Sequence, residues 1–157
     1  MTMIIDIDFR SELGGPRDQG RRPTCLSFAA SDAHRHRKRH PEPLSVEWLF
    51  YHVARYAKTG LHCGTTLPDT RAVLQSLGQP EERVWPYSTM PPIASAWRPP
   101  AVRQPLMTCG STECTADISA ISEQLEAGIP VVIGMFISTS FLSPVHWTYH
   151  GSEVVLG

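Results

Sequence analysis

The sequence lacks the features that mark several large classes of protein. Its 157 residues carry almost no net charge, since 14 Lys and Arg stand against 15 Asp and Glu. That balance removes the main electrostatic reason to expect a nucleic-acid partner. The longest apolar run, residues 131–137, is far shorter than the roughly 18 residues that span a bilayer. We therefore expect neither a nucleic acid nor a membrane as a partner.

Cysteine is also scarce. Cys25, Cys63, Cys109 and Cys114 are too few for a disulfide-dense scaffold, and they lack the paired CxxC spacing of structural zinc sites. We expect no metal and no cofactor.

The first ten residues, MTMIIDIDFR, lack the basic and long apolar segments of a Sec signal. This predicts a cytoplasmic protein, or an effector exported without such a signal.

Hydrophobic spacing and capping residues predict a helical first half. Helices are expected over residues 25–39, 46–58 and 67–77, capped by Thr24, Ser45 and Thr66. The apolar stripe of the second helix includes Trp48, Leu49, Val53 and Tyr56. Residues 79–105 hold seven prolines and predict a long irregular crossover, tethered by Trp85 and Trp97.

The second half predicts more strand. Thr115 is expected to cap a helix over 116–127 whose inward side chains are Ile118, Ile121 and Leu125. Strands are expected over 131–137 and 152–156, and a short strand or extended arm over 4–10. Helices followed by strands indicate an α+β protein, which we treat as a single domain over residues 1–157.

The stretch 18–28, DQGRRPTCLSF, is the part of the sequence that predicts chemistry. Cys25 falls in the first turn of a predicted helix, where unpaired N–H groups and the helix dipole favour the thiolate. Arg21 and Arg22 add positive charge nearby. Gln19, on the loop before the helix, is expected to aim its side-chain amide at a developing oxyanion, with the Cys25 N–H as second donor. The alternative is a small, inert cysteine at a helix start.

Several stretches, in order and at compatible spacing, resemble papain-like cysteine peptidases. They are IDFR at 7–10, DQGRRPTCLSFA at 18–29, LSVEWL at 44–49, CGTTLPD at 63–69, VWPY at 84–87 and GIPVV at 128–132. The resemblance implies a two-lobe fold, with a helical lobe over about residues 11–100. Residues 1–10 and 101–157 would form part of a β-barrel lobe.

Within that fold the resemblance implies a peptidase acting on peptide or protein substrates. Cys25 would be the nucleophile that forms an acyl-enzyme, and Gln19 the oxyanion-hole donor. The substrate-binding segment would consist of Gly64, Thr65, Thr66, Leu67 and Pro68. The first three would pair with an extended peptide. Leu67 and Pro68 would form one wall of a specificity pocket, with plain helix-start packing as the alternative.

The sequence departs from the family at two points. Arg22 replaces the cysteine that would normally bridge to the position of Cys63, so Cys63 is expected to be free. A papain-type histidine lies about 130–150 residues after the cysteine, so we expect it beyond Gly157. His146 and His150 are candidate substitute bases, with exposed loop histidines as the alternative.

Because the catalytic histidine is not evident in the sequence, three functions remain open. The first is a peptidase, and the second is a papain-fold module that holds peptide without cutting it. The third is a toxin or effector that uses the same thiol for processing, deamidation or acyl transfer. We also expect the β-barrel lobe to be partial, with its apolar face exposed or completed by a further chain or segment.

Overall fold

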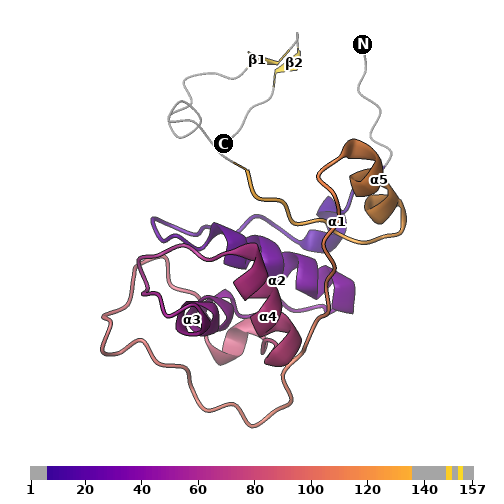
Figure 1. The fold of residues 1–157 in the computed structure, drawn as a ribbon. Coiled ribbons are helices and arrows are strands. Elements are labelled where there is room, and N and C mark those ends of the chain that lie inside the picture. Colours follow the sequence, from indigo (N-terminus) through magenta and orange to yellow (C-terminus); the bar gives the residue numbers. More distant parts are fainter. Residues whose placement is uncertain (1–6, 136–147, 150–151, 154–157) are drawn as a thin grey trace.

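The computed structural model describes residues 7–135, 148–149 and 152–153. Its helical part consists of three packed helices, α2 (Cys25–Lys38), α3 (Val46–Tyr56) and α4 (Leu67–Ser76). The remaining elements are α1 (Arg10–Leu13), the 3-10 helix η1 (Glu82–Val84), α5 (Ile118–Glu126), and the antiparallel strands β1 (Thr148–Tyr149) and β2 (Ser152–Glu153). Figure 1 shows α1 lying against α2, and α5 to one side of the packed helices.

Two of the predicted helix caps are confirmed. Ser45 accepts a hydrogen bond from the Trp48 N–H at 3.1 Å, and Thr66 accepts one from the Asp69 N–H at 3.3 Å. Both bonds satisfy N–H groups that a helix leaves without a partner in its first turn. α3 and α4 therefore begin where their capping residues predict.

The core fills the space between these helices. One cluster joins Leu49 and Val53 of α3 to Ala30 of α2 and to Val73 and Leu74 of α4. A second cluster packs Phe50, Ala54 and Leu61 against Trp97. Trp97 thus tethers the crossover, as predicted. Tyr56 was expected in the apolar stripe of α3 and is instead exposed, because the helix ends there at the molecular surface.

A buried polar network lies beside this core. The side chain of Gln79 donates to Ser31 Oγ at 2.7 Å and to the Ser45 carbonyl at 3.0 Å. Its Oε1 lies 2.9 Å from His34 Nδ1, which therefore carries the proton. Burial lowers the pKa of His34, so the ring is held neutral at ordinary pH. The network fixes α2, the start of α3 and the chain after α4 relative to one another.

For the N-terminal segment the sequence predicts a short strand or an extended arm, and the strand is not seen where it can be compared. Residues 7–9 form no strand, and residues 4–6 lie outside the described part. Asp8 Oδ1 accepts the Arg10 N–H at 2.9 Å, and the Phe9 carbonyl accepts the Leu13 N–H at 2.8 Å. These local bonds turn the chain into α1, because a side-chain acceptor competes with strand pairing.

The helix of the second half starts later than predicted. Its cap is Asp117, whose carboxylate accepts the Ala120 N–H at 2.9 Å. The Thr115 hydroxyl, the expected cap, bonds to the Asp117 carboxylate instead. Ile118 was expected to face inward and is 86% exposed, because no described element covers that side of α5.

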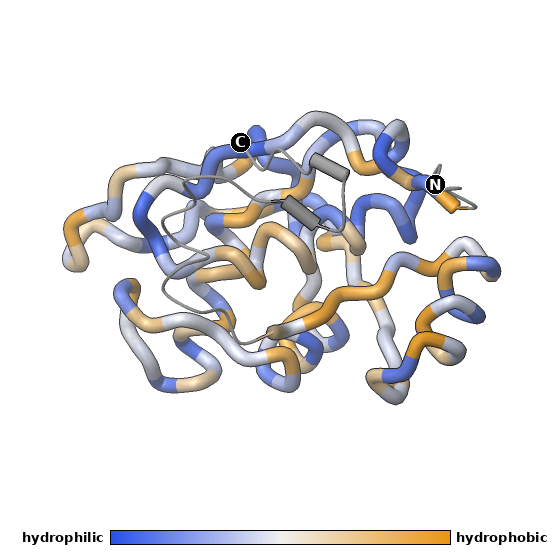
Figure 2. Tube along the Cα trace, turned by 90° about the horizontal axis from the view of Figure 1, so that it is seen from above, coloured by the Kyte–Doolittle hydropathy of each residue, from blue (hydrophilic) through white to orange (hydrophobic). Residues whose placement is uncertain are grey.

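The predicted strand over 131–137 is also not found. Residues 131–135 form no strand, and residues 136–137 are not described. Ile133 and Met135 are exposed. Figure 2 shows a largely hydrophobic stretch of chain after α5 that runs up to the grey trace. The strand predicted over 152–156 is seen as β2, and residues 154–156 lie outside the description. In the part that the structure describes, the sheet consists of β1 and β2 alone. The expected partial β-barrel is therefore not seen there.

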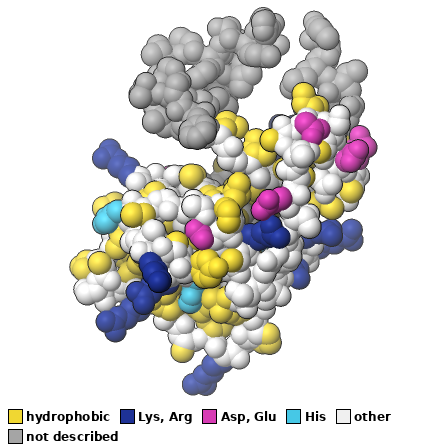
Figure 3. All heavy atoms as spheres, viewed as in Figure 1, with side chains coloured by type: hydrophobic (Ala, Val, Ile, Leu, Met, Phe, Trp, Pro, Cys, Tyr) yellow, Lys and Arg dark blue, Asp and Glu magenta, His cyan; other side chains and the backbone are white. Residues whose placement is uncertain are grey.

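The surface carries no concentration of charge on the face drawn in Figure 3. Hydrophobic side chains gather over the middle of the helical part, and Lys and Arg side chains project around its edges. No helix among the described residues combines the length and apolar character needed to cross a bilayer.

Gly78 offers a test of how the chain leaves α4. Its φ is +82°, and a Cβ added there would stand 2.3 Å from the Met107 carbonyl oxygen. Gly78→Ala should therefore lower the free energy of unfolding by about 2–4 kcal/mol in urea denaturation, from backbone strain and the clash. Gly60→Ala is the matched control, since a Cβ at Gly60 meets no atom within 4 Å. Equal effects of the two substitutions would contradict this geometry.

His52 offers a test of pH dependence. Burial lowers its pKa from 6.5, and its Nε2 has no hydrogen-bond partner. The unfolded chain binds a proton here more readily than the folded protein, so this contribution to stability is complete above pH 6.5 and declines as the pH falls below it. His52→Phe keeps the ring packing on Trp48 and removes the proton site. As the pH is lowered from 7.5 to 5.5, the free energy of unfolding should fall less steeply in this variant than in the unaltered protein.

Candidate functional site

Cys25 is the first residue of α2, and its thiol is exposed and free. The first N–H groups of a helix have no acceptor within the helix itself. No side chain caps α2, because Thr24 makes no capping hydrogen bond. An accessible sulfur thus lies at an open helix N-terminus, an arrangement that favours negative charge.

The prediction that Thr24 caps α2 is wrong for a specific reason. Its Oγ1 lies 2.7 Å from the hydroxyl oxygen of Tyr87, and that hydroxyl lies 2.8 Å from the Gln19 carbonyl oxygen. A carbonyl can only accept, so the single Tyr87 hydroxyl proton goes to Gln19 and Thr24 donates to Tyr87. The Thr24 hydroxyl is therefore turned away from the helix.

Gln19 lies on the loop that leads into Cys25. Its side-chain Nε2 donates to the Arg22 carbonyl at 3.0 Å, and a primary amide has a second N–H to offer. The next residue, Gly20, has φ +61°, and a Cβ there would come within 2.6 Å of the Thr89 carbonyl oxygen. Only glycine allows this close approach between the loop and the crossover.

The sequence suggested that Arg22 adds positive charge beside the Cys25 thiol. In the structure this charge is not free. Arg22 is 2% exposed, and its guanidinium contacts the Glu47 carboxylate through two hydrogen bonds of 2.5 and 2.7 Å. It also donates to the Ser88 carbonyl at 2.7 Å, while Trp97 Nε1 donates to Glu47 at 2.7 Å. The charge is neutralised inside the protein, because this position of the loop faces the core.

The proposed substrate-binding segment is largely open. Gly64 is exposed and a Cβ there would meet no atom within 4 Å, while Thr66 caps α4. Leu67 and Pro68 are exposed at the start of α4. A Cβ at Gly134 would lie 3.9 Å from Leu67 Cδ1. The stretch after α5 therefore passes beside the start of α4.

Thr65 is the half-buried member of this segment, with a buried hydroxyl that has no hydrogen-bond partner. The arrangement leaves the backbone of residues 64–66 next to exposed apolar side chains. Such a combination suits an extended peptide, whose main chain pairs with the backbone while its side chains enter apolar pockets.

The two candidate substitute bases, His146 and His150, lie outside the described residues. Most histidines that are described have neighbours of their own: His34 with Gln79, His36 with Glu12, His40 with Glu81, and His52 with Trp48. His62 is exposed on the loop before Gly64. Across the described ranges, no three His, Cys, Asp or Glu side chains gather in a way that would hold a metal ion.

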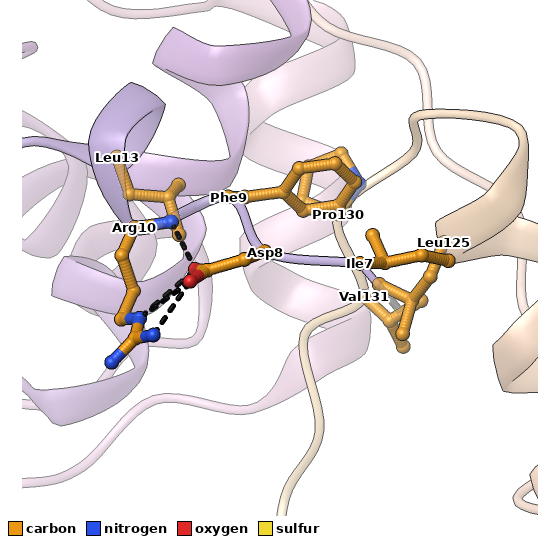
Figure 4. A pocket seen from close by; sticks show the side chains of 8 residues that line it. All are labelled: Ile7, Asp8, Phe9, Arg10, Leu13, Leu125, Pro130 and Val131. Atoms are coloured by element: carbon orange, nitrogen blue, oxygen red, sulfur yellow. Dashed lines mark hydrogen bonds and ion pairs between the residues drawn. The ribbon is translucent and has the colours of Figure 1, made fainter. Parts of the chain in front are cut away.

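A cavity of about 360 Å³ lies elsewhere, between the N-terminal segment and the chain around α5. Figure 4 shows Ile7 facing Leu125 and Val131 across it, while Asp8 turns to Arg10. Hydrogen bonds from the Arg10 side chain lower the pKa of Asp8 to about 2. None of the predicted site residues lines this cavity.

No family model matches the sequence, and no curated protein matches it. The structure is similar to the crystal structure of xylellain, a cysteine protease from Xylella fastidiosa, with a TM-score of 0.62 and 24% sequence identity. The similarity covers 74% of this chain and 52% of xylellain, so the chain spans about half the length of that protein.

The described helices match the helical lobe of a papain-like fold. This confirms the helical part of the predicted architecture. At this level of identity the likeness concerns the fold alone. Any role for Cys25 and Gln19 therefore has to be argued from the local geometry described above.

Two residues of the site escaped sequence reasoning. Tyr87 belongs to the VWPY turn, but the sequence gives no sign that its hydroxyl reaches back to Gln19 and Thr24. Glu47 follows the cap of α3, a position where an exposed acidic residue is common. Its flanking residues Val46 and Trp48 are both buried, and this run of apolar neighbours was the one available signal.

The ion pair between Arg22 and Glu47 generates a stability prediction. Arg22→Met should lower the free energy of unfolding by about 3–5 kcal/mol, because it leaves the Glu47 charge buried without its partner. Arg71→Ala is the control, because Arg71 pairs with Glu113 at the surface. This substitution should change the free energy of unfolding by no more than about 0.5 kcal/mol. Urea denaturation measures both.

A double variant separates the pair from its surroundings. Arg22→Met combined with Glu47→Gln should destabilise by less than the sum of the single substitutions, because the second change removes the charge that the first exposed. Strict additivity would show that the two side chains do not interact.

Proposed function

We propose that the chain is a papain-like cysteine peptidase that hydrolyses peptide bonds through a Cys25 acyl-enzyme, with Gln19 in the oxyanion hole. The observation that carries this proposal is the exposed thiol of Cys25 at an uncapped helix N-terminus. Beside it, the loop that leads into the helix holds the Gln19 amide. The similarity to the fold of a cysteine protease supports the same function.

The chemistry follows from these positions. The Cys25 sulfur would attack the carbonyl carbon of the scissile bond, and negative charge would develop on the carbonyl oxygen. The Cys25 N–H and the second N–H of the Gln19 side chain would donate to that oxygen. Collapse of the tetrahedral species would expel the amine and leave a thioester, which water then hydrolyses.

Peptide substrates fit the segment from Gly64 to Pro68. Its exposed backbone would pair with an extended substrate, and Leu67 would contact an apolar side chain of that substrate. The base that takes the thiol proton and returns it to the leaving amine is a histidine in this mechanism. His146 and His150 are its candidates within the sequence.

The reactivity of Cys25 is measured by alkylation with iodoacetamide and mass spectrometry of the modified peptides. Cys63 and Cys114 are exposed too and serve as internal controls. Near pH 7 Cys25 should be modified at least about tenfold faster than either, because it is the one of the three that stands at an open helix N-terminus, where unpaired N–H groups stabilise negative charge on a reacting atom. Equal rates at the three cysteines would contradict the proposal.

Hydrolysis of a fluorogenic peptide tests turnover. Cys25→Ala should abolish it, and Gln19→Ala should reduce kcat by about 10²–10³, the range expected for one oxyanion donor. Turnover that survives Cys25→Ala would assign the activity to another group.

A module that binds peptide without cutting it is the second candidate. It is favoured by the engagement of His34, His36, His40 and His52 with neighbours away from Cys25. Peptide binding that is saturable, unchanged by Cys25→Ala and accompanied by no cleavage would establish it over the peptidase.

A further inference from the structure

We propose that Tyr87 is a positioning residue for the oxyanion hole, an inference that rests on the proposed function. Its hydroxyl lies 2.8 Å from the Gln19 carbonyl and 2.7 Å from Thr24 Oγ1. Gln19 carries one expected oxyanion donor, and Thr24 directly precedes the residue that carries the other. A single phenol thus contacts the chain on both sides of the site.

The first role of Tyr87 concerns Gln19. The Tyr87 hydroxyl donates to the backbone carbonyl of this residue, so it fixes the point from which the side-chain amide projects. The amide is held at its other end by the Arg22 carbonyl at 3.0 Å. With both ends held, the second N–H of the amide keeps one direction, and this preorganisation is what makes an oxyanion donor effective.

The second role concerns the start of α2. Threonine before a helix normally turns its hydroxyl to the N–H groups of the first turn. Here the Thr24 hydroxyl donates to Tyr87, and the Thr24 backbone, at φ −110° and ψ 9°, is outside the extended conformation of a usual cap. Tyr87 therefore keeps the Thr24 hydroxyl away from the N–H groups of Leu26 and Ser27, which a threonine cap would bind, and the first turn of α2 stays uncapped beside Cys25.

Tyr87 is itself held firmly. Its N–H donates to Glu82 Oε1 at 2.6 Å, and its ring meets Phe28 edge-on with centroids 4.7 Å apart. The Arg22 guanidinium carbon lies 4.7 Å from the centroid of the Tyr87 ring. Burial raises the pKa of the Tyr87 hydroxyl, so it stays protonated and able to donate. These ring contacts survive when the hydroxyl alone is removed.

The test compares two variants that break the same hydrogen bond. Tyr87→Phe and Thr24→Val each abolish the bond between Thr24 and Tyr87. Only Tyr87→Phe also releases the Gln19 carbonyl and leaves a hydroxyl at Thr24 that is free to cap α2. We expect Tyr87→Phe to lower the affinity for a peptide aldehyde about tenfold, and Thr24→Val to lower it less than threefold. A merely structural role for the bond predicts equal losses.

The affinity is measured with a peptide aldehyde. The Cys25 sulfur adds to the aldehyde carbon, the carbonyl π pair moves to oxygen, and the thiol proton ends on that oxygen, which occupies the oxyanion hole. Gln19→Ala should weaken this adduct as Tyr87→Phe does, and the double variant should be no weaker than Gln19→Ala alone. Alkylation of Cys25 by iodoacetamide develops no oxyanion and should change less than twofold in Gln19→Ala and in Thr24→Val, which both leave α2 uncapped.

Amide hydrogen exchange gives a readout that needs no catalysis. Tyr87→Phe should raise exchange in residues 17–24 about fivefold and leave α4 unchanged. Tyr56→Phe is the control, because it removes the hydroxyl of an exposed tyrosine on α3. If exchange and aldehyde affinity are both unaltered by Tyr87→Phe, the inference is overturned. If Tyr87→Phe raises exchange but the unaltered protein binds no aldehyde, Tyr87 still anchors the loop and the proposed peptidase function is rejected.

Discussion

The buried ion pair between Arg22 and Glu47 is the interaction on which the arrangement of the site depends. Removing both charges from water is costly, and the cost is offset only when each charged group is paired and hydrogen-bonded. Here the two carboxylate oxygens accept from Arg22, one of them also accepts from Trp97, and Arg22 donates further to the Ser88 carbonyl. These contacts require one specific placement of the loop against α3 and the crossover.

An ion pair holds that loop differently from the disulfide that the resemblance assigns to the same position. A disulfide acts largely by restricting the unfolded chain, and so it holds its two ends together in any state. Arg22 and Glu47 attract each other only when α3 and Trp97 are already packed around them. The position of Gln19, whose amide bonds to the Arg22 carbonyl, is therefore coupled to the folding of the core.

Sequence reasoning succeeded where the determinant is local. Ser45 and Thr66 cap their helices because the N–H groups that they bind lie three residues away. It failed at Thr24, whose partner Tyr87 is 63 residues along the chain. It also failed over 131–135, because a run of β-branched residues forms a strand only if a neighbouring strand is present to pair with it. Motifs thus predicted the positions of Cys25 and Gln19, but not the contacts that hold them.

The open end of α2 connects these local details to function. A helix that lacks its cap gives up about 1 kcal/mol of stability, and threonine is well suited to supply one. In this chain the threonine is present, yet its hydroxyl donates to Tyr87 and the N–H groups beside Cys25 are left without a side-chain acceptor. Folded proteins depart from such local rules mainly at functional sites, where the unsatisfied groups serve a ligand or a reacting atom. The N–H groups that a threonine cap would bind, those of Leu26 and Ser27, lie in the same turn as the Cys25 N–H that an oxyanion would need, so the lost stability and the open helix end beside Cys25 have one structural cause.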